Sequence, residues 1–325
     1  MTGSDLSDSI PETAHGWHRE GKGAVLATVI ETWGSAPRRV GAQLAISGAG
    51  EIEGSVSGGC VEGAVIVEAL EALEEGAARE LEFGVSDGDA FAVGLACGGT
   101  IRVLVEPVGS VLPEALLADL CAARAARVPV AYVVDLDTGA RRLERDGFET
   151  RFRMDRSGFE EGSRTFVAIH NPPLRLIVVG AVHIAQALVP MARIAGYDPA
   201  IVDPRETFGA QARFPGETLL NDWPDEAVEQ LGLDSRTALV LLTHDPKLDD
   251  PALTLALRSG CFYIGALGST RTHAKRVARM QEAGFSEAEI ARIHGPVGLD
   301  IGAAGPSEIA VSILAEMTGV LRKGA

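Results

Sequence analysis

One segment in the second half of the chain constrains the fold more than any other. Residues 174–180, LRLIVVG, form a near-continuous apolar run, a helical pattern follows through AQALVPMARIAG, and PAIVD (199–203) ends in an acid. A strand, a glycine turn, a helix and a second strand in this order are typical of a dinucleotide-type βαβ unit. Further apolar runs at 237–244 and 261–268, each followed by a helical stretch, and a closing amphipathic helix predict a Rossmann-like parallel-sheet domain over residues 174–325.

The phosphate turn of this unit departs from the usual pattern. It reads Gly180-Ala-Val182-His183-Ile-Ala, so a valine stands where a second glycine lets a pyrophosphate approach the backbone. Asp203 lies 23 residues after Gly180, close to the spacing at which an acid binds a ribose. We therefore leave open NAD(P) or another nucleotide, a pterin phosphate, and an empty scaffold. Gly180, His183 and Asp203 are the candidate binding residues, although a local hydrogen bond is the simpler role for His183.

The first half of the chain has a different pattern. Short β-rich runs alternate with turn residues, and two helical runs, 61–76 and 112–128, interrupt them; the β-rich runs are 24–34, 41–47, 52–57, 78–85 and 101–108. A hairpin-rich segment then leads to a seam near Asn171-Pro172-Pro173. We expect a mixed α+β domain over residues 15–170, and an α/β protein as a whole.

Two glycine-rich turns each carry a cysteine. Cys60 lies in GSVSGGCVEG (54–63) directly before a predicted helix, where free backbone N–H groups and the helix dipole favour a thiolate. Cys97 lies in GLACGG (94–99), again beside glycines. Such turns suit a cleft for a flat or anionic ligand, and ordinary β-turns with small core thiols are the alternative. Cys121 and Cys261 lie in apolar patterns and are interpreted as packing residues.

A third glycine segment carries two arginines. In TWGSAPRRVGA (32–42) a predicted strand ends at Gly34 and Ser35, and Arg38 and Arg39 follow a proline. Guanidinium groups bind phosphate or carboxylate oxygens, so the three segments together predict an anion-binding cleft, although a solvated arginine pair explains this segment alone. The candidate residues in these turns are Gly34, Ser35, Arg38, Ser57, Gly58, Gly59, Glu62, Gly98 and Gly99, with Cys60 and Cys97 as the chemically active pair.

Composition excludes several classes of function. The formal net charge of -16 and the pI near 4.9 argue against a nucleic-acid surface. No apolar run reaches membrane-spanning length and the N-terminus lacks a basic head and an apolar core, so we expect a cytoplasmic protein with no membrane contact. Four unpaired cysteines and three histidines without ligand spacing (His244, His273 and His294) predict neither a disulfide framework nor a metal site.

The ordered motifs resemble a known family. GSAPRRVGA, GSVSGGCVEG and GLACGGTIRVLVEP are similar to the N-terminal signature of the XdhC/CoxI family, the accessory factors of xanthine dehydrogenase and related molybdenum hydroxylases. GAVHIAQAL, VDPR, THDPKLDD, YIGALGSTRTHAKR and RIHGPVGLDIGA resemble its C-terminal Rossmann domain in the same order. The resemblance covers most of the chain.

The resemblance implies a protein that binds molybdenum cofactor, supports its sulfuration by a cysteine desulfurase and delivers it to a hydroxylase apoenzyme. Arg38 and Arg39 would then bind the cofactor phosphate, and Cys60 or Cys97 would contact molybdenum or relay sulfur. Glu62 would orient its loop or cap the helix.

Gly268, Ser269 and Arg271 would lie at the carboxyl edge of the parallel sheet, where such sheets bind ligands. His294, Pro296 and Asp300 are expected in a loop before the last helix.

An enzyme remains the alternative interpretation. An NAD(P)-dependent oxidoreductase would use the Rossmann half together with a cysteine of the first half, whereas Val182 favours a maturation factor over a dehydrogenase. The sequence leaves open the client enzyme, the cysteine that contacts metal and a homodimer.

Overall fold

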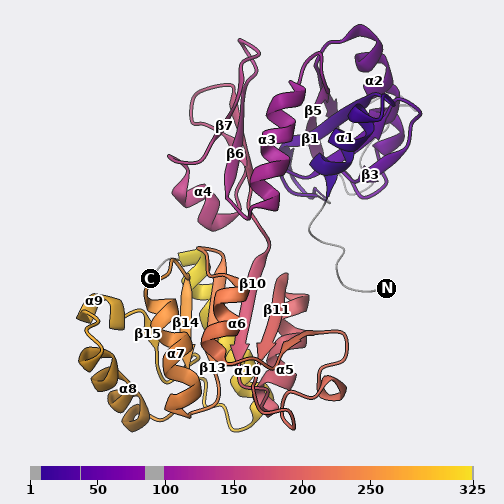
Figure 1. The fold of residues 1–325 in the computed structure, drawn as a ribbon. Coiled ribbons are helices and arrows are strands. Elements are labelled where there is room, and N and C mark those ends of the chain that lie inside the picture. The colour runs from indigo at the N-terminus through magenta and orange to yellow at the C-terminus, as the bar shows by residue number, and fades with distance from the viewer. Residues whose placement is uncertain (1–8, 37, 85–98, 324–325) are drawn as a thin grey trace. The chain divides into compact units, whose positions relative to one another are not determined.

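The structure is a computed structural model that describes residues 9–36, 38–84 and 99–323. The chain divides into two compact units, with the boundary between Pro172 and Pro173. Each unit has its own sheets (Figure 1), and each has its own hydrophobic core. The predicted fold class, a mixed α+β half followed by a parallel-sheet Rossmann half, is confirmed.

One sheet of the first unit has five described strands, all antiparallel. They are β1 (Ala24–Trp33), β2 (Gln43–Ser47), β3 (Ile52–Gly54), β4 (Arg79–Phe83) and β5 (Thr100–Pro107), in the order β3-β2-β1-β5-β4. Residues 24–30 of β1 are all buried, because apolar layers cover both faces of this central strand. A register shift interrupts the β1–β5 pairing between Val29 and Glu31.

Helices separate the first unit into layers. Helix α2 (Glu62–Glu75) packs on one face of the five-stranded sheet through Val65, Ala69 and Ala72. The other face meets α1 (Ile10–Arg19), α3 (Glu114–Ala125) and a second antiparallel sheet in one hydrophobic cluster. That sheet has the order β7-β6-β9-β8, from β6 (Val130–Asp135), β7 (Arg141–Glu144), β8 (Gly158–Phe159) and β9 (Thr165–His170).

Two helices of the first unit were absent from the sequence prediction. Helix α1 begins at Ile10 with a proline in its first turn, and it buries only Ile10, Pro11 and Ala14, which is too short a pattern to stand out. Helix α4 (Glu149–Met154) has six residues and no buried side chain, so its apolar periodicity is equally weak. Both are short elements that depend on contacts with the rest of the unit.

The second unit is a six-stranded parallel sheet with helices on both faces (Figure 1). Its strands are β10 (Leu174–Val179), β11 (Tyr197–Val202), β12 (Thr218–Leu220), β13 (Thr237–Leu241), β14 (Tyr263–Ala266) and β15 (Ile293–His294). Helices α5 (His183–Ile194) and α10 (Pro306–Lys323) pack on one face. The other face carries α6 (Pro224–Leu231), α7 (Pro246–Leu257), α8 (Thr270–Glu282) and α9 (Glu287–Ile290).

The strand order β12-β11-β10-β13-β14-β15 fixes where a ligand crevice opens. The chain runs outward from β10 to β12 on one side and from β13 to β15 on the other, so the topological switch point lies between β10 and β13. His294 corrects the sequence prediction: it lies in β15, paired with β14, rather than in a loop. Only two residues pair there, too few to give a strand pattern.

Candidate functional site

The loop that joins β3 to α2 is organised around the carboxylate of Glu62. Its Oε1 accepts hydrogen bonds from Ser55 Oγ at 2.6 Å, Val56 N at 3.2 Å and Ser57 N at 2.9 Å. Its Oε2 accepts from Ser57 Oγ and from Gly59 N, the latter at 2.9 Å. Five donors thus converge on one carboxylate that is only 8% exposed.

The two serines complete this network. Ser55 Oγ accepts from Gly58 N at 2.8 Å, and Ser57 Oγ accepts from Cys60 N at 3.0 Å and Val61 N at 2.9 Å. The six consecutive N–H groups of residues 56–61 are therefore all donated to side chains of the loop itself. This corrects the expectation of free backbone N–H groups around Cys60, because the Glu62 carboxylate and the hydroxyls of Ser55 and Ser57 accept all of their hydrogen bonds.

Glu62 orients the loop rather than capping the helix. The N-cap position of α2 is Val61, which makes no side-chain cap. Burial alone would raise the pKa of Glu62, but the hydrogen bonds from Ser55 and Ser57 lower it to about 2. The carboxylate is therefore charged throughout the physiological range and holds the loop in one conformation.

Cys60 lies exposed on this ordered loop. The two preceding residues, Gly58 and Gly59, have φ values of +75° and +109°. L-residues with a side chain rarely adopt such values, so the sharp turn before the thiol requires glycine at both positions. A Cβ placed on Gly59 would meet no atom within 4 Å, so the backbone beside Cys60 is open to an approaching group. The loop thus presents a thiol next to an uncovered stretch of main chain.

The described parts of the other two glycine segments lie close together, where β1 ends and β5 begins. Trp33 at the end of β1 pairs with Thr100 at the start of β5, and a Cβ on Gly99 would lie 2.4 Å from the carbonyl oxygen of Ser35. Gly99 therefore permits close contact with the segment that begins at Gly34.

One hydrophobic cluster joins the Glu62 loop, the segment that begins at Gly34 and strand β5. It contains Val56 and Val61 of the Glu62 loop and Ile101 of β5, with Ala36 packed against it. Arg38 is half-buried and Arg39 is exposed. Cys97 and Gly98 lie outside the described residues, so their roles stay predictions.

In the second unit, the turn after β10 is closed tightly against its neighbours. Gly180 has φ +109°, and a Cβ there would lie 2.8 Å from Cγ2 of Thr243, so only glycine fits. Its N–H donates to Val202 O at 2.8 Å. Val182 packs against the core as the N-cap residue of α5, and His183, the first helical residue, is exposed.

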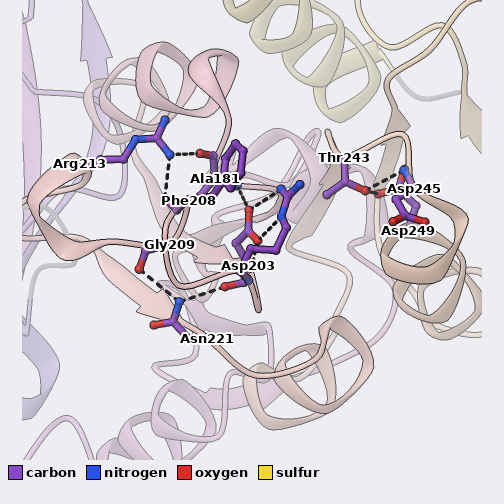
Figure 2. A network of polar contacts seen from close by, with 10 residues as sticks. Ala181, Asp203, Phe208, Gly209, Arg213, Asn221, Thr243, Asp245 and Asp249 are labelled. Carbon is purple, nitrogen blue, oxygen red and sulfur yellow. Dashed lines mark hydrogen bonds and ion pairs between the residues drawn. The ribbon is translucent and has the colours of Figure 1, made fainter.

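Asp203 holds this turn from the end of β11 (Figure 2). Its Oδ2 accepts from Ala181 N at 2.8 Å and from Arg205 Nη2 at 2.7 Å, and its Oδ1 accepts from Arg205 Nε at 2.8 Å and Arg205 N at 3.0 Å. Burial would raise the pKa of Asp203, but the hydrogen bonds from Arg205 and Ala181 hold it below its usual value.

Both oxygens of Asp203 are therefore engaged within the chain. A ribose could bind them only by displacing Arg205, in contrast to the role expected from spacing alone.

Sequence reasoning missed a group of residues beside Asp203, namely Arg205, Phe208 and Arg213. The guanidinium of Arg205 lies 4.2 Å from the ring centroid of Phe208. Arg213 Nη1 donates to Ala181 O at 2.6 Å and to Phe208 O at 2.7 Å (Figure 2). Both the N–H and the carbonyl of Ala181 are thus used within the chain. The sequence signal that could have indicated this group is Arg205, which lies two residues after Asp203.

The loop after β14 carries the remaining predicted residues. Gly268 has φ +145°, and Ser269 caps α8 by accepting from Thr272 N at 3.2 Å. Ser269 and Arg271 are exposed at the carboxyl end of the sheet, as the sequence placed them.

Two kinds of site are absent from the described parts of the chain. Within residues 9–36, 38–84 and 99–323, no group of three or more His, Cys, Asp or Glu side chains is placed to hold a metal ion. Across the same ranges, no helix has the length and apolar character needed to cross a membrane.

Comparison with known proteins gives a consistent picture. Residues 17–84 match the XdhC and CoxI family and residues 176–317 match the XdhC Rossmann domain. The chain is 36% identical over 300 residues to the molybdenum cofactor insertion chaperone PaoD of Escherichia coli (strain K12), covering 92% of this chain and 84% of that protein.

More distant relatives extend the match. A protein of Bacillus subtilis (strain 168) described as a probable xanthine dehydrogenase subunit is 26% identical over 318 residues, which cover 90% of this chain and 92% of that protein. A crystal structure described as a xanthine dehydrogenase from Bacillus halodurans superposes with a TM-score of 0.65 at 26% identity, covering 100% of this chain and 97% of that one.

Proposed function

The chain belongs to the XdhC and CoxI family, and from this premise we propose that it binds molybdenum cofactor and inserts it into a molybdenum hydroxylase apoenzyme. Identity of 36% to a molybdenum cofactor insertion chaperone over nearly the whole chain supports the proposal. The structural observation that carries it is the Glu62 loop, residues 55–62, which holds the exposed thiol of Cys60 beside open backbone.

The residues of this loop fit part of the cofactor. A pterin dithiolene bound to molybdenum needs a soft ligand near the metal and donors for its phosphate. The thiol of Cys60 meets the first need, and the open face at Gly59 leaves room for a bulky group to reach it. When bound, the cofactor supplies the metal and the terminal sulfido ligand that the client enzyme uses.

The loop does not supply the phosphate donors. Its N–H groups from 56 to 61 already bind Glu62, Ser55 and Ser57, so the phosphate must be bound elsewhere. Arg38 and Arg39 are the candidates in this unit. In this proposal the thiol of Cys60 contacts the metal, and the guanidinium groups of Arg38 and Arg39 bind the phosphate.

The same thiol suits sulfur transfer. In our proposal a cysteine desulfurase is the partner: the Cys60 thiolate attacks the outer sulfur of the desulfurase persulfide, a new S–S bond forms at Cys60, and the desulfurase leaves as a thiolate. Exposure of Cys60 on a fixed loop permits the close approach of a second protein that this step needs.

A transfer assay tests the proposal. The full chain is loaded with molybdenum cofactor, separated from free cofactor, and mixed with a hydroxylase apoenzyme whose recovered activity is measured. Wild type and Cys121→Ser are expected to activate the client equally, and Cys60→Ser is expected to activate it at least about tenfold less. Cys121 is the matched control because it is half-buried on α3 and burial raises the pKa of its thiol to about 11.

Two outcomes would contradict the proposal. One is activation by the loaded chain that is no better than activation by the same amount of free cofactor. The other is a change in nicotinamide absorbance when the chain is mixed with NAD(P)+ and an oxidisable substrate of the client, or with NAD(P)H and a reducible one, which would favour the oxidoreductase alternative.

A further inference from the structure

A buried arginine lies beneath the loop that joins β14 to α8. Arg276 is 1% exposed, and its Nη2 donates to Leu267 O at 2.9 Å. Its Nε and Nη1 are buried and have no hydrogen-bond partner in the described structure. The guanidinium therefore points at the residue that precedes Gly268 with two of its donating nitrogens unused.

The acid beside it does not complete the pairing. Asp249 Oδ2 lies 3.9 Å from Arg276 Nη2, beyond hydrogen-bond distance, and has no hydrogen-bond partner among the described residues, while Oδ1 accepts from Thr243 Oγ1 at 2.6 Å. Burial lowers the pKa of Arg276 and raises the pKa of Asp249, which is the direction expected for ions that lack full compensation.

The neighbouring acid, Asp250, is not an acceptor for Arg276 in the described structure. Asp250 is engaged by Arg279 through contacts of 2.5 and 2.9 Å. The charges of Arg276 and Arg279 are balanced by those of Asp249 and Asp250, but the guanidinium of Arg276 still has more unused donors than Asp249 has unused acceptors.

The loop above Arg276 has the geometry of an anion site. Gly268 adopts φ +145°, and a Cβ there would lie 3.0 Å from the side chain of Thr272, so the chain turns sharply into α8. Ser269 occupies the N-cap position, which leaves the N–H groups of Thr270 and Arg271 as the first two of a 13-residue helix, where no intrahelical acceptor exists. Ser269, Thr270 and Arg271 are all exposed.

We propose that residues 268–271, with Arg276 beneath them, bind the phosphate group of a phosphate ester. An anion over the N-terminus of α8 is stabilised by the N–H groups and the helix dipole, and also by the nearby guanidinium of Arg276, whose Nε and Nη1 have no acceptor among the described residues. At the corresponding turn after β10, the N–H of Ala181 already donates to the carboxylate of Asp203. The second unit therefore binds phosphate on the β14 side of its switch point.

The source of the phosphate follows from the proposed function and rests on it. The terminal phosphate of molybdenum cofactor is one phosphate ester, and a free nucleotide or inorganic phosphate presents the same chemistry. The site itself requires only the phosphate, so it can be tested without the cofactor.

The experiment removes one backbone donor and keeps the helix. Thr270→Pro deletes the N–H at the first helical position, where proline is tolerated, and Ser269 already has the φ of -71° and ψ of 163° that a residue before proline prefers. Thr270→Ala controls for the lost hydroxyl. Glu287→Pro is the matched control, since Ser286 caps α9 with φ -70° and ψ 160°.

Binding of inorganic phosphate to the full chain is measured by calorimetry for each variant. Wild type, Thr270→Ala and Glu287→Pro are expected to bind within about twofold of one another, and Thr270→Pro about tenfold more weakly. Arg276→Gln is expected to weaken binding to a similar extent. No saturable binding to wild type, or equal binding by wild type and Thr270→Pro, overturns the site.

A second pair of ligands identifies the source. A phosphorylated pterin and the same pterin without phosphate are titrated against wild type and Thr270→Pro. Tighter binding of the phosphorylated pterin, lost in Thr270→Pro, supports the cofactor as source. If inorganic phosphate binds and the phosphorylated pterin does not, the phosphate site stands and its assignment to the cofactor is overturned, whatever the transfer assay shows.

Discussion

Replacing Glu62 with glutamine tests the organisation of the thiol loop. The charged carboxylate accepts five hydrogen bonds, from two hydroxyls and three backbone N–H groups. Glutamine keeps one acceptor oxygen and turns an NH2 group toward donors at the other position, which leaves buried N–H groups unpaired. The loop should then lose its single conformation while the strands and α2 remain.

The magnitude follows from the pKa of Glu62. It falls from the ordinary value of 4.5 to about 2 in the folded chain. One pKa unit corresponds to about 1.4 kcal/mol, so the fall corresponds to about 3 kcal/mol, of which solvent screening near the surface leaves about 2 kcal/mol. Because the folded pKa is the lower one, this stability is present above pH 4.5 and is lost as the pH falls toward 2.

The assay is urea unfolding of the full chain at pH 7, 4 and 2.5, together with hydrogen exchange of the 55–62 peptide. We expect Glu62→Gln to lower the free energy of unfolding of the first unit by about 2 kcal/mol at pH 7, and the difference from wild type to shrink toward pH 2. Exchange should increase in residues 56–61. Glu53→Gln, an exposed carboxylate on β3, is the control and should change the free energy of unfolding by less than about 0.5 kcal/mol. Equal effects of the two variants at pH 7 would refute the reasoning.

Two further predictions concern the scaffold. Gly180→Ala places a methyl group 2.8 Å from Thr243 in a backbone with φ +109°, so it should lower the free energy of unfolding of the second unit by about 2–4 kcal/mol in urea. Gly196→Ala, with φ +87° and open space, should cost only about 1–2 kcal/mol, and an equal cost would show that the contact with Thr243 is unimportant. Burial lowers the pKa of His170 to about 3, so wild type should lose stability as the pH falls from 6.5 toward 3, because the unfolded chain takes up a proton that the folded chain does not. His170→Gln should flatten that decline in urea unfolding, and an unchanged slope would contradict the assignment.

The sequence predicted the scaffold well because periodicity carries the information. The apolar run at 174–179 and the helical pattern that follows it predict a βαβ unit from local signals alone. The glycine turn before α2 was likewise visible, and the sequence placed Cys60 at the correct end of the helix, whereas the exposure of its thiol is a finding of the structure.

The contacts within the sites were not predictable from the same signals. The glycine pair Gly58-Gly59 signals a sharp turn, but which acceptor the N–H groups of that turn bind depends on how the loop folds back on Glu62, and no sequence pattern specifies that. Asp203 has the spacing of a ribose ligand, yet its partner Arg205 lies only two residues away and occupies both oxygens. Arg276 reads as one more charge on a basic helix, and only the fold buries it.

The most direct measurement is equilibrium retention of molybdenum cofactor by the purified chain, with pterin fluorescence and metal content read together. Cofactor released from a denatured donor enzyme is offered to wild type, Cys60→Ser and Cys97→Ser. Saturable, near-stoichiometric retention that is lost in at least one serine variant is the predicted result. Retention no greater than that of an unrelated acidic protein would contradict the account.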